Sequence, residues 1–242
     1  MEMDMHSHYA YTTTAPLRGC HQLERIPALN FEALLRPTQR AVILATHPFD
    51  EVLACGGLLQ LLSLRGHAMQ LLSVTDEPFC AEHHEERRSV AQALENSDSL
   101  RRLGIPPVQM KWVRGRFLPG NLASQRDCLL AFLNRYVRSG DVVFAPWRRD
   151  GDADRETVAR AAWLVCEALG ARLVEMPIQA WQWVSWRDHQ VPWHQTRKLA
   201  LDRPTLARKR HAIKSQAVGP FALSASSEQR RHLQLHYELF IL

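Results

Sequence analysis

Apolar runs of strand length alternate with amphipathic helical stretches from about residue 40 to about residue 180. This alternation constrains the fold strongly, because each strand–helix–strand unit closes with a right-handed crossover and so builds a parallel sheet between helices. Ala41–Thr46 is a continuous apolar run, which is typical of a strand covered on both faces. The pattern therefore predicts an α/β fold.

The expected architecture is a Rossmann-like three-layer α/β/α sandwich with a mostly parallel sheet. Glycines that follow the apolar periodic stretches mark helix ends, since glycine adopts the left-handed cap conformation easily. The expected strands are 41–46, 69–75, 108–113, 141–145 and 172–177, with 180–186 as a sixth candidate. The expected helices are 51–65, 82–103, 122–138 and 155–169.

The two ends of the chain show less pattern. Residues 1–38 have little periodicity, so we expect an N-terminal arm followed by a single domain over residues 39–242. The tail from about residue 198 has a helical pattern and then becomes polar. The first 18 residues lack the basic start and apolar stretch of a secretory signal.

Composition excludes several classes of protein. The chain has 46% hydrophobic and 23% charged residues, as an ordinary globular protein does. Its net charge of +5 comes from scattered basic residues, apart from Arg208-Lys209-Arg210 and Arg230-Arg231, so we expect no nucleic-acid partner. No apolar run approaches the roughly 18–20 residues of a membrane span. The five cysteines have no CxxC spacing, which is typical of reduced thiols in a cytoplasmic protein.

The segment after the first expected strand carries the chemistry. His47 and Asp50 stand at the carboxyl end of that strand, where open α/β sheets bind ligands, and both are metal ligands by type. Asp50 can alternatively cap the helix that follows it, and Glu51 suits the positive end of the helix dipole. Gly56 and Gly57 predict close packing or a kink in that helix, since no phosphate-binding loop pattern surrounds them.

These residues resemble a known family. His47-Pro-Phe-Asp-Glu51, followed by two glycines, resembles the first motif of the PIG-L/LmbE-like metal-dependent N-deacetylases, which is written HPDDE. The segment 145–156, leading into a helix, is similar to the family's second motif, a proline-led loop that ends in HPDH. The resemblance extends over roughly residues 40–221.

The resemblance implies a reaction and a set of roles. The family removes N-acetyl groups from amino sugars and similar conjugates with a bound zinc or another divalent cation. His47 and Asp50 match two metal ligands, and Asp154 matches a supporting aspartate of the second motif. The small-molecule substrate implied here is an amino-sugar-like compound.

Three positions depart from the family pattern. The general-base position is Phe49, which accepts no proton. The oxyanion-stabilising position is Asp152, whose charge repels a developing oxyanion. The third ligand position is Arg155, whose guanidinium keeps its proton and does not ligate metals.

Two arrangements of the site remain open at this point. In the first, an aspartate of the second motif completes the metal site or acts as the base, with Asp152 and Asp154 as the catalytic candidates. In the second, Arg155 replaces the cation and pairs with Asp50 or Asp154. The cofactor is therefore zinc or another divalent cation if the site is intact, or none.

Further residues are expected around the same site. Tryptophans are concentrated in the second half of the chain, and their rings either stack on sugars or fill the core. His189 and His194 are the remaining candidates for an imidazole that reaches the site. The residues expected to line a substrate pocket are Phe49, Glu51, Asp76, Trp147, Arg148, Asp150, Arg155 and Trp183.

Three functions compete. The first is an active hydrolase that removes an acyl group from an N-acyl amino sugar or related conjugate. The second is a non-catalytic descendant that binds a sugar-like or anionic ligand or a protein partner. The third, a nucleotide-binding module, lacks a phosphate loop and ranks below both. The sequence predicts no particular oligomeric state.

Overall fold

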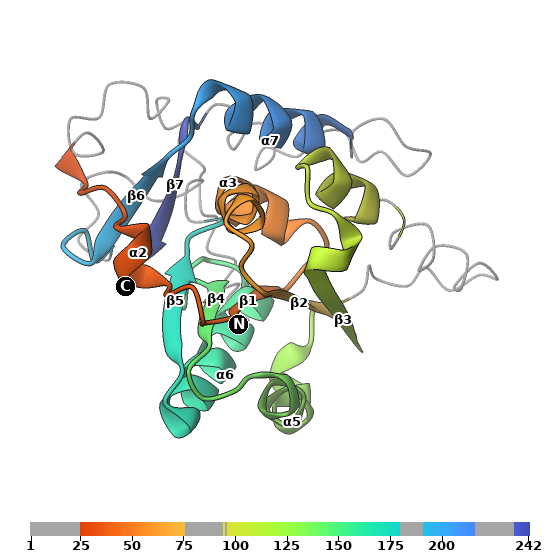
Figure 1. The fold of residues 1–242 in the computed structure, drawn as a ribbon. Coiled ribbons are helices and arrows are strands. Elements are labelled where there is room, and N and C mark those ends of the chain that lie inside the picture. Colours follow the sequence, from red (N-terminus) through yellow and green to blue (C-terminus); the bar gives the residue numbers. More distant parts are fainter. Residues whose placement is uncertain (1–24, 76–93, 95, 180–190, 216–234) are drawn as a thin grey trace, which may run out of the picture.

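The computed structural model describes residues 25–75, 94, 96–179, 191–215 and 235–242. Within these residues one sheet has the strand order β3-β2-β1-β4-β5-β7-β6 (Figure 1). The first five strands in the chain pair in parallel, and the last two pair antiparallel. The strands are β1 (Ala41–Ala45), β2 (Met69–Thr75), β3 (Met110–Phe117), β4 (Val142–Pro146), β5 (Arg172–Met176), β6 (Thr196–Ala200) and β7 (Tyr237–Ile241).

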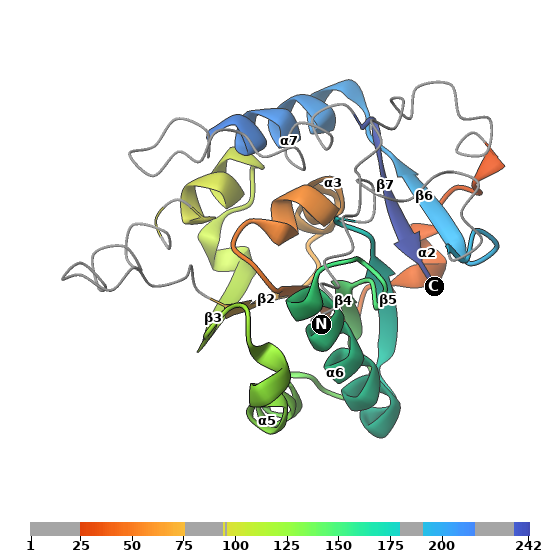
Figure 2. The ribbon, with the colours of Figure 1, turned by 180° about the vertical axis from the view of Figure 1, so that it is seen from behind.

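The mostly parallel sheet and the three layers predicted from the sequence are confirmed. Helices α3 and α7 and the helical segment 96–102 cover one face of the sheet, and α5 and α6 cover the other (Figures 1 and 2). The expected helix over 122–138 starts as a 3₁₀ turn, η2. The helices are α2 (Phe31–Leu34), α3 (Asp50–Leu64), η1 (Pro107–Gln109), η2 (Leu122–Gln125), α5 (Arg126–Tyr136), α6 (Ala153–Leu169) and α7 (Arg203–Ser215).

The tail differs from the expected helix followed by polar chain, because it also contributes two strands. β6 has the sequence TRKLA and lies at the sheet edge, where half-exposed polar side chains replace the apolar run of a central strand. β7 has the sequence YELFI, in which the buried Glu238 interrupts the apolar run that marks a central strand. The sixth candidate strand, 180–186, lies outside the described residues.

The expected N-terminal arm is described only from residue 25 onward. Within that part, Phe31, Leu34 and Leu35 are buried and join the core on the α3 side of the sheet. Arg172 of β5 donates hydrogen bonds to the carbonyls of Ala33 and Leu34. Residues 31–35 are therefore held by the same core as the rest of the domain.

The core has a part on each face of the sheet. β1 is buried along its whole length, as expected for a central strand between two helix layers. One cluster lies between the sheet and α3, and a second lies between the sheet and α5 with α6. In the described parts of the chain, no helix combines the length and apolar character that crossing a bilayer requires.

Helix α3 bends near its glycine pair, which confirms the kink expected there. Cys55 has φ −139° and ψ 24°, so the helix consists of two segments. A Cβ added at Gly57 would lie 2.3 Å from Leu201 Cδ2 and 3.1 Å from Glu238 Oε1. A side chain at this position would therefore have to displace Leu201 and crowd Glu238, which glycine avoids.

A buried ion pair contacts the backbone on both sides of the kink. Glu238 of β7 accepts hydrogen bonds from the N–H groups of Gly57 and Leu58, which begin the second segment. Lys209 of α7 donates to the carbonyl of Leu53, which ends the first segment, and lies 2.6 Å from Glu238. Each charge thus meets the helix end of opposite partial charge.

Candidate functional site

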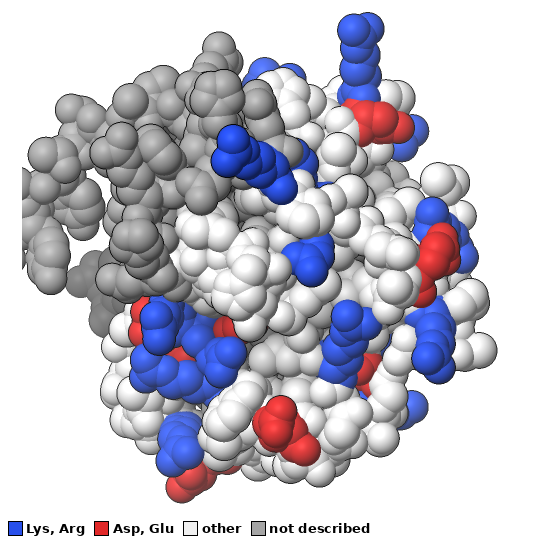
Figure 3. Space-filling model, turned by 90° about the vertical axis from the view of Figure 1, so that its left-hand side faces the viewer, with Lys and Arg blue, Asp and Glu red and all other residues white. Residues whose placement is uncertain are grey.

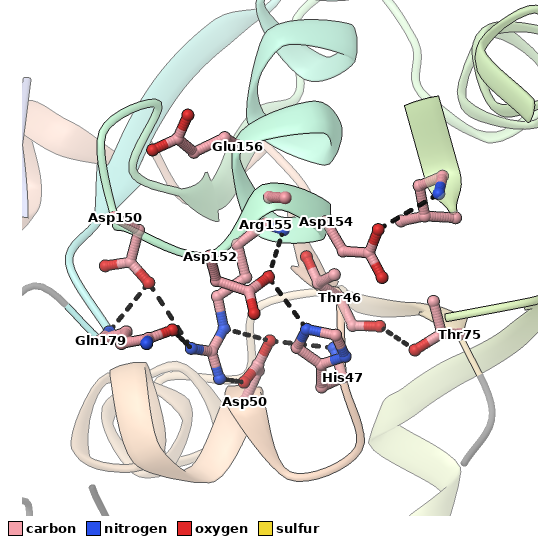
Figure 4. A network of polar contacts seen from close by, with 12 residues as sticks. Thr46, His47, Asp50, Thr75, Asp150, Asp152, Asp154, Arg155, Glu156 and Gln179 are labelled. Atoms are coloured by element: carbon pink, nitrogen blue, oxygen red, sulfur yellow. Dashed lines mark hydrogen bonds and ion pairs between the residues drawn. The ribbon is translucent and has the colours of Figure 1, made fainter. Parts of the chain in front are cut away.

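The predicted site residues meet where the strand order reverses direction along the chain. β1 has β2 on one side and β4 on the other, so its carboxyl end lies at the topological switch point. His47 and Asp50 follow β1, while Asp150, Asp152 and Arg155 come from the loop after β4 and the start of α6 (Figure 4). The two motifs are therefore joined in space, as ligand-binding segments of α/β folds are.

Arg155 and Asp50 form a two-point ion pair. The guanidinium donates from Nη2 to Asp50 Oδ1 at 2.6 Å and from Nε to Oδ2 at 3.2 Å. The side chains are only 6% and 2% exposed. Such a fork-to-carboxylate contact is among the stronger ion pairs in proteins, and burial protects it from screening by salt.

Asp150 and Gln179 complete the surroundings of the guanidinium. Arg155 Nη1 lies 3.3 Å from Gln179 Oε1 and 3.6 Å from Asp150 Oδ2. Asp150 is fully buried and accepts hydrogen bonds from the backbone N–H groups of Ile178 and Gln179. The loop after β5 therefore supports Arg155, although the sequence analysis did not select Gln179. Its position after a strand at the same sheet edge was the available signal.

His47 and Asp152 form a second, more accessible contact. The imidazole Nε2 lies 3.1 Å from Asp152 Oδ1, and the two side chains are 27% and 28% exposed. Asp152 also caps α6 by accepting a hydrogen bond from the backbone N–H of Arg155. Figure 4 places this pair beside the Arg155–Asp50 pair.

The His47–Asp152 contact shifts both titrations. Burial lowers the pKa of His47, but the hydrogen bond to Asp152 and the charges of Asp50 and Asp152 outweigh it, so the pKa lies above 6.5. Burial raises the pKa of Asp152, but hydrogen bonds from His47 and the Arg155 N–H outweigh it and lower the pKa to about 2. Asp152 is therefore ionised at neutral pH, and His47 is more easily protonated than an ordinary histidine.

Phe49 fills the general-base position of the family motif with an apolar side chain. Its ring is buried, with 4% exposure, within the core on the α3 side of the sheet. Its backbone has φ 80° and ψ −5°, a left-handed conformation that aspartate adopts much more readily than bulky residues do. The backbone thus keeps a geometry that suits aspartate while the side chain has changed.

Asp154 acts on the backbone of a neighbouring loop. Its carboxylate accepts hydrogen bonds from the N–H groups of Gly120 and Leu122, the second at 3.1 Å. Figure 4 shows it turned away from Arg155 and His47. The contact matches the supporting role that the family resemblance implies for this aspartate.

Glu51 is a buried acid next to the ion pair. It is 1% exposed, and among the residues that the structure describes neither carboxyl oxygen has a hydrogen-bond partner. Burial, with the charge of Asp50 as a smaller cause, raises its pKa to about 8. The group is therefore mostly a neutral acid at pH 7, because desolvation penalises the charged form.

The other expected pocket residues lie in different surroundings. Trp147 is buried in a small cluster with Val191, Trp193 and Ile241. Arg148 donates to Glu175 and lies over the ring of Trp163. His194 is exposed. Asp76, Trp183 and His189 lie outside the described residues.

The residues present do not fit the cation site that the family resemblance implies. Both oxygens of Asp50 face the guanidinium of Arg155, which stands at the expected third-ligand position. A guanidinium contributes five donors and no lone pair to a metal. Across the described ranges, no three His, Cys, Asp or Glu side chains are grouped as a metal site requires. Of the two arrangements left open by the sequence, the geometry matches the pairing of Arg155 with Asp50.

Comparison with known proteins shows which solved structures share this fold. No protein-family model and no curated protein match the sequence. Among solved structures, the conserved protein TT1542 from Thermus thermophilus is 21% identical, with a TM-score of 0.55 over 84% of this chain and 93% of that one. The N,N′-diacetylchitobiose deacetylase from Pyrococcus horikoshii is 16% identical, with a TM-score of 0.51 over 78% and 75%.

The fold shared with LmbE/PIG-L-type deacetylases, expected from the two motifs, is therefore confirmed. The fold alone does not determine the reaction. GalB, the 4-carboxy-2-hydroxymuconate hydratase from Pseudomonas putida, is 14% identical and has a TM-score of 0.53 over 80% of this chain and 82% of its own.

Proposed function

We propose that this chain is a PIG-L/LmbE-like protein that has lost metal-dependent deacetylation and binds a small sugar-like ligand at the former active site. One observation carries the proposal: Arg155 holds both oxygens of Asp50, the carboxylate that the family pattern assigns to the cation. The guanidinium supplies a positive charge that is covalently attached to the chain. The buried carboxylate is thereby compensated without a cation from solution.

The substituted side chains point in the same direction. Loss of a general base costs about 10²–10⁴-fold in rate, and loss of an oxyanion donor costs about 10²–10³-fold. Phe49 and Asp152 occupy those two positions. An active N-deacetylase, the competing function, would need Asp152 or Asp154 as a replacement. Asp152 is engaged with His47, and Asp154 with the backbone near residue 120.

The charges around the site favour a neutral ligand over an anionic one. Carboxylates outnumber cationic groups among the described residues here, and an anion would be repelled. His47 and Asp152 offer neighbouring donor and acceptor groups that suit sugar hydroxyls. The charged groups labelled in Figure 4 are Asp50, Asp150, Asp152, Asp154 and Glu156 against Arg155 and the protonatable His47.

The similarity to a chitobiose deacetylase supports a sugar-like ligand. The lack of CxxC spacing among the cysteines supports a cytoplasmic location.

Metal analysis tests the loss of the cation. Protein purified without chelators or a histidine tag is incubated with excess zinc, desalted and measured by elemental analysis beside His47→Ala. We expect no stoichiometric metal in either protein. Near-stoichiometric zinc that disappears in the His47→Ala variant would overturn the proposal and favour an active hydrolase.

A restored site provides the positive control. The triple variant Phe49→Asp, Asp152→His and Arg155→His returns the family residues at the base, oxyanion and third-ligand positions. We expect it to bind zinc, and adding His47→Ala to it should abolish that binding. Zinc bound equally by the wild type and the triple variant would contradict the assignment of Arg155 as the replacement for the cation.

Ligand binding is tested separately with N-acetylglucosamine and glucosamine as probes, by calorimetry. We expect binding of a neutral sugar to weaken in His47→Ala and to survive in Arg160→Ala, an exposed control on α6. Binding of glucose 6-phosphate in preference to the neutral sugar would contradict the electrostatic argument.

A further inference from the structure

The Arg208-Lys209-Arg210 run, which the site does not use, belongs to a basic surface of the folded chain. α7 has the sequence RPTLARKRHAIKS, which contains five Lys or Arg residues and no acidic one. Lys209 points inward and closes the α3 kink with Glu238. Most of the remaining basic side chains of α7 face outward, and those that are exposed are Arg203, Arg208, His211 and Lys214.

A second element extends this surface. The helical segment 96–102 lies beside α7 in both ribbon views (Figures 1 and 2). Arg102 Nη1 lies 2.9 Å from His211 Nε2, which joins the two elements directly. Arg208 passes over the end of the segment, since a Cβ added at Gly104 would lie 3.9 Å from Arg208 Cδ. Arg101, 67% exposed, adds another charge.

Few acidic groups offset these charges among the described residues. Asp98 pairs with Arg102 at 2.6 Å and approaches Arg101 at 3.8 Å. Asp202 precedes α7 and accepts a hydrogen bond from the Thr205 N–H. On the face drawn in Figure 3, several basic side chains adjoin acidic ones, including those gathered at the lower left. The surface of α7 and segment 96–102 is therefore a local excess of positive charge on a chain whose net charge is only +5.

We propose that the surface formed by Arg101, Arg102, Arg203, Arg208, His211 and Lys214 docks an acidic segment of another protein. Arginine forks match carboxylates in geometry, and four of these six side chains are arginines. From Arg203 to Lys214 the exposed charges extend about 16 Å along the helix axis, at 1.5 Å per residue. An acidic helix or strand of similar length fits this spacing.

A protein partner accounts for the surface better than a single-stranded nucleic acid does. Single-stranded nucleic acids are bound by aromatic side chains that stack on bases, in addition to positive charge. Neither α7 nor segment 96–102 contains Phe, Tyr or Trp. The central exposed residue of the α7 face is Ala207, which leaves room for a backbone or a short side chain to approach. The proposal does not depend on the function of the site around Arg155.

The test uses fluorescence anisotropy of the full chain with a labelled glutamate-rich peptide and with a labelled DNA duplex of matched net charge. The variant Arg208→Glu with Lys214→Glu reverses the charge of two side chains of this surface. The control, Arg126→Glu with Arg135→Glu, changes the net charge equally on exposed positions of α5. Thermal unfolding of both variants verifies that they fold.

The expected result is peptide binding that weakens about tenfold or more in the α7 variant and less than about twofold in the α5 control, since local charge pairs rather than net charge set the affinity. Equal weakening by both variants would overturn the proposal, because net charge alone would then explain binding. Tight binding of the duplex with none of the peptide would also overturn it in favour of a nucleic-acid partner. Failure to bind the peptide at low ionic strength would end it outright.

Discussion

Both oxygens of Asp50 are held by the guanidinium of Arg155, at 2.6 Å from Nη2 and 3.2 Å from Nε. The two residues are 105 positions apart and come from the two segments that resemble the family motifs. On the function proposed above, the guanidinium of Arg155 supplies the positive charge that a cation shared by those motifs would supply in a metal enzyme. The ion pair therefore joins the segment after β1 to the start of α6, which follows β4.

Removing the guanidinium leaves buried charge without compensation. We expect Arg155→Met to destabilise the fold by about 3–5 kcal/mol, because Asp50 and Asp150 lose their cation. Adding Asp50→Asn should recover part of this loss, since one of the orphaned charges is removed. Urea unfolding at pH 7 measures both. Arg160→Met, an exposed change on the same helix, serves as the control, and an equal effect of Arg155→Met and Arg160→Met would contradict the importance of the pair.

Glu51 gives stability a distinct pH dependence. Its folded pKa of about 8 lies above the ordinary 4.5, so the folded state holds its proton longer than the unfolded state does. Between pH 4.5 and about 8 the unfolded chain ionises first, and the wild type should lose stability at up to about 1.4 kcal/mol per pH unit from this residue. The favourable contribution is complete below pH 4.5, and the loss levels off above about pH 8.

The variant Glu51→Gln isolates that dependence. Its stability relative to the wild type should rise across the same pH interval, as measured by urea unfolding at a series of pH values. Glu167→Gln, an exposed change on α6, should leave the difference flat. A constant difference between Glu51→Gln and the wild type from pH 4.5 to 8 would mean that Glu51 is not protonated in the folded state.

Features set by neighbouring residues in the sequence, such as an apolar strand or a glycine pair in a helix, could be predicted. The apolar run of β1 indicated a strand covered on both faces, and the glycine pair of α3 indicated close packing or a kink; the structure has all of these features. The contacts of Glu238 with Gly57 were not predictable in this way, because they join residues 181 positions apart. The edge strand β6 was missed because its side chains are mostly polar and half-exposed, and β7, between β5 and β6, was missed because the buried Glu238 interrupts its apolar run.

The electrostatics of the site depended on burial that the sequence does not show. α3 lies between the sheet and α7, so nearly all its faces are apolar or buried. From the sequence alone, Glu51 has the features of an ordinary acid at the start of a helix. One of the two arrangements left open by the sequence paired Arg155 with Asp50 or Asp154. The choice between these partners follows from the turn of α6, which directs Asp154 to the backbone near residue 120. Placement of the backbone therefore decided which of two sound chemical pairings formed.

The pKa of His47 should fall when Asp152 loses its charge. The hydrogen bond and charge of Asp152 raise the pKa of His47 above 6.5 against the effect of burial, so Asp152→Asn removes the main opposing cause. The stability contributed by protonated His47 is present below pH 6.5 and is lost as pH rises through its folded pKa. NMR titration of the imidazole C–H signals measures the change. Asp98→Asn, at a surface ion pair elsewhere, should leave His47 unaffected.

Phe49 should respond to substitution in an unusual order. Phe49→Ala removes a buried ring and should cost about 3–5 kcal/mol. Phe49→Gly removes the same ring but relieves the left-handed backbone at φ 80°, so it should be more stable than Phe49→Ala by about 1 kcal/mol. At the exposed helical control Ala131, replacement by glycine should instead destabilise by about 1 kcal/mol. The same order at both positions would argue against a left-handed conformation at residue 49.

Replacing the two adjacent glycines at the kink in α3 by alanine should have different effects on stability. A Cβ at Gly57 would lie 2.3 Å from Leu201 Cδ2 and close to Glu238, so Gly57→Ala must displace side chains at the buried ion pair. We expect it to cost about 1–3 kcal/mol, as overpacking of a core does. A Cβ at Gly56 meets its nearest atoms at 3.4 Å, so Gly56→Ala needs little adjustment.

Gly56→Ala is therefore the matched control, one residue away in the same helix. It should change the free energy of unfolding by less than about 1 kcal/mol in either direction, because the higher helix propensity of alanine offsets the tighter packing. Urea unfolding of the two variants under the same conditions gives the comparison. Lys209 and Glu238 join α7 and β7 to this bend. A costly Gly57→Ala beside a neutral Gly56→Ala would therefore also indicate that the C-terminal elements hold the helix that carries Asp50. If Gly57→Ala instead changed the free energy of unfolding as little as Gly56→Ala, the bend would tolerate a side chain and the ion pair would adjust to it.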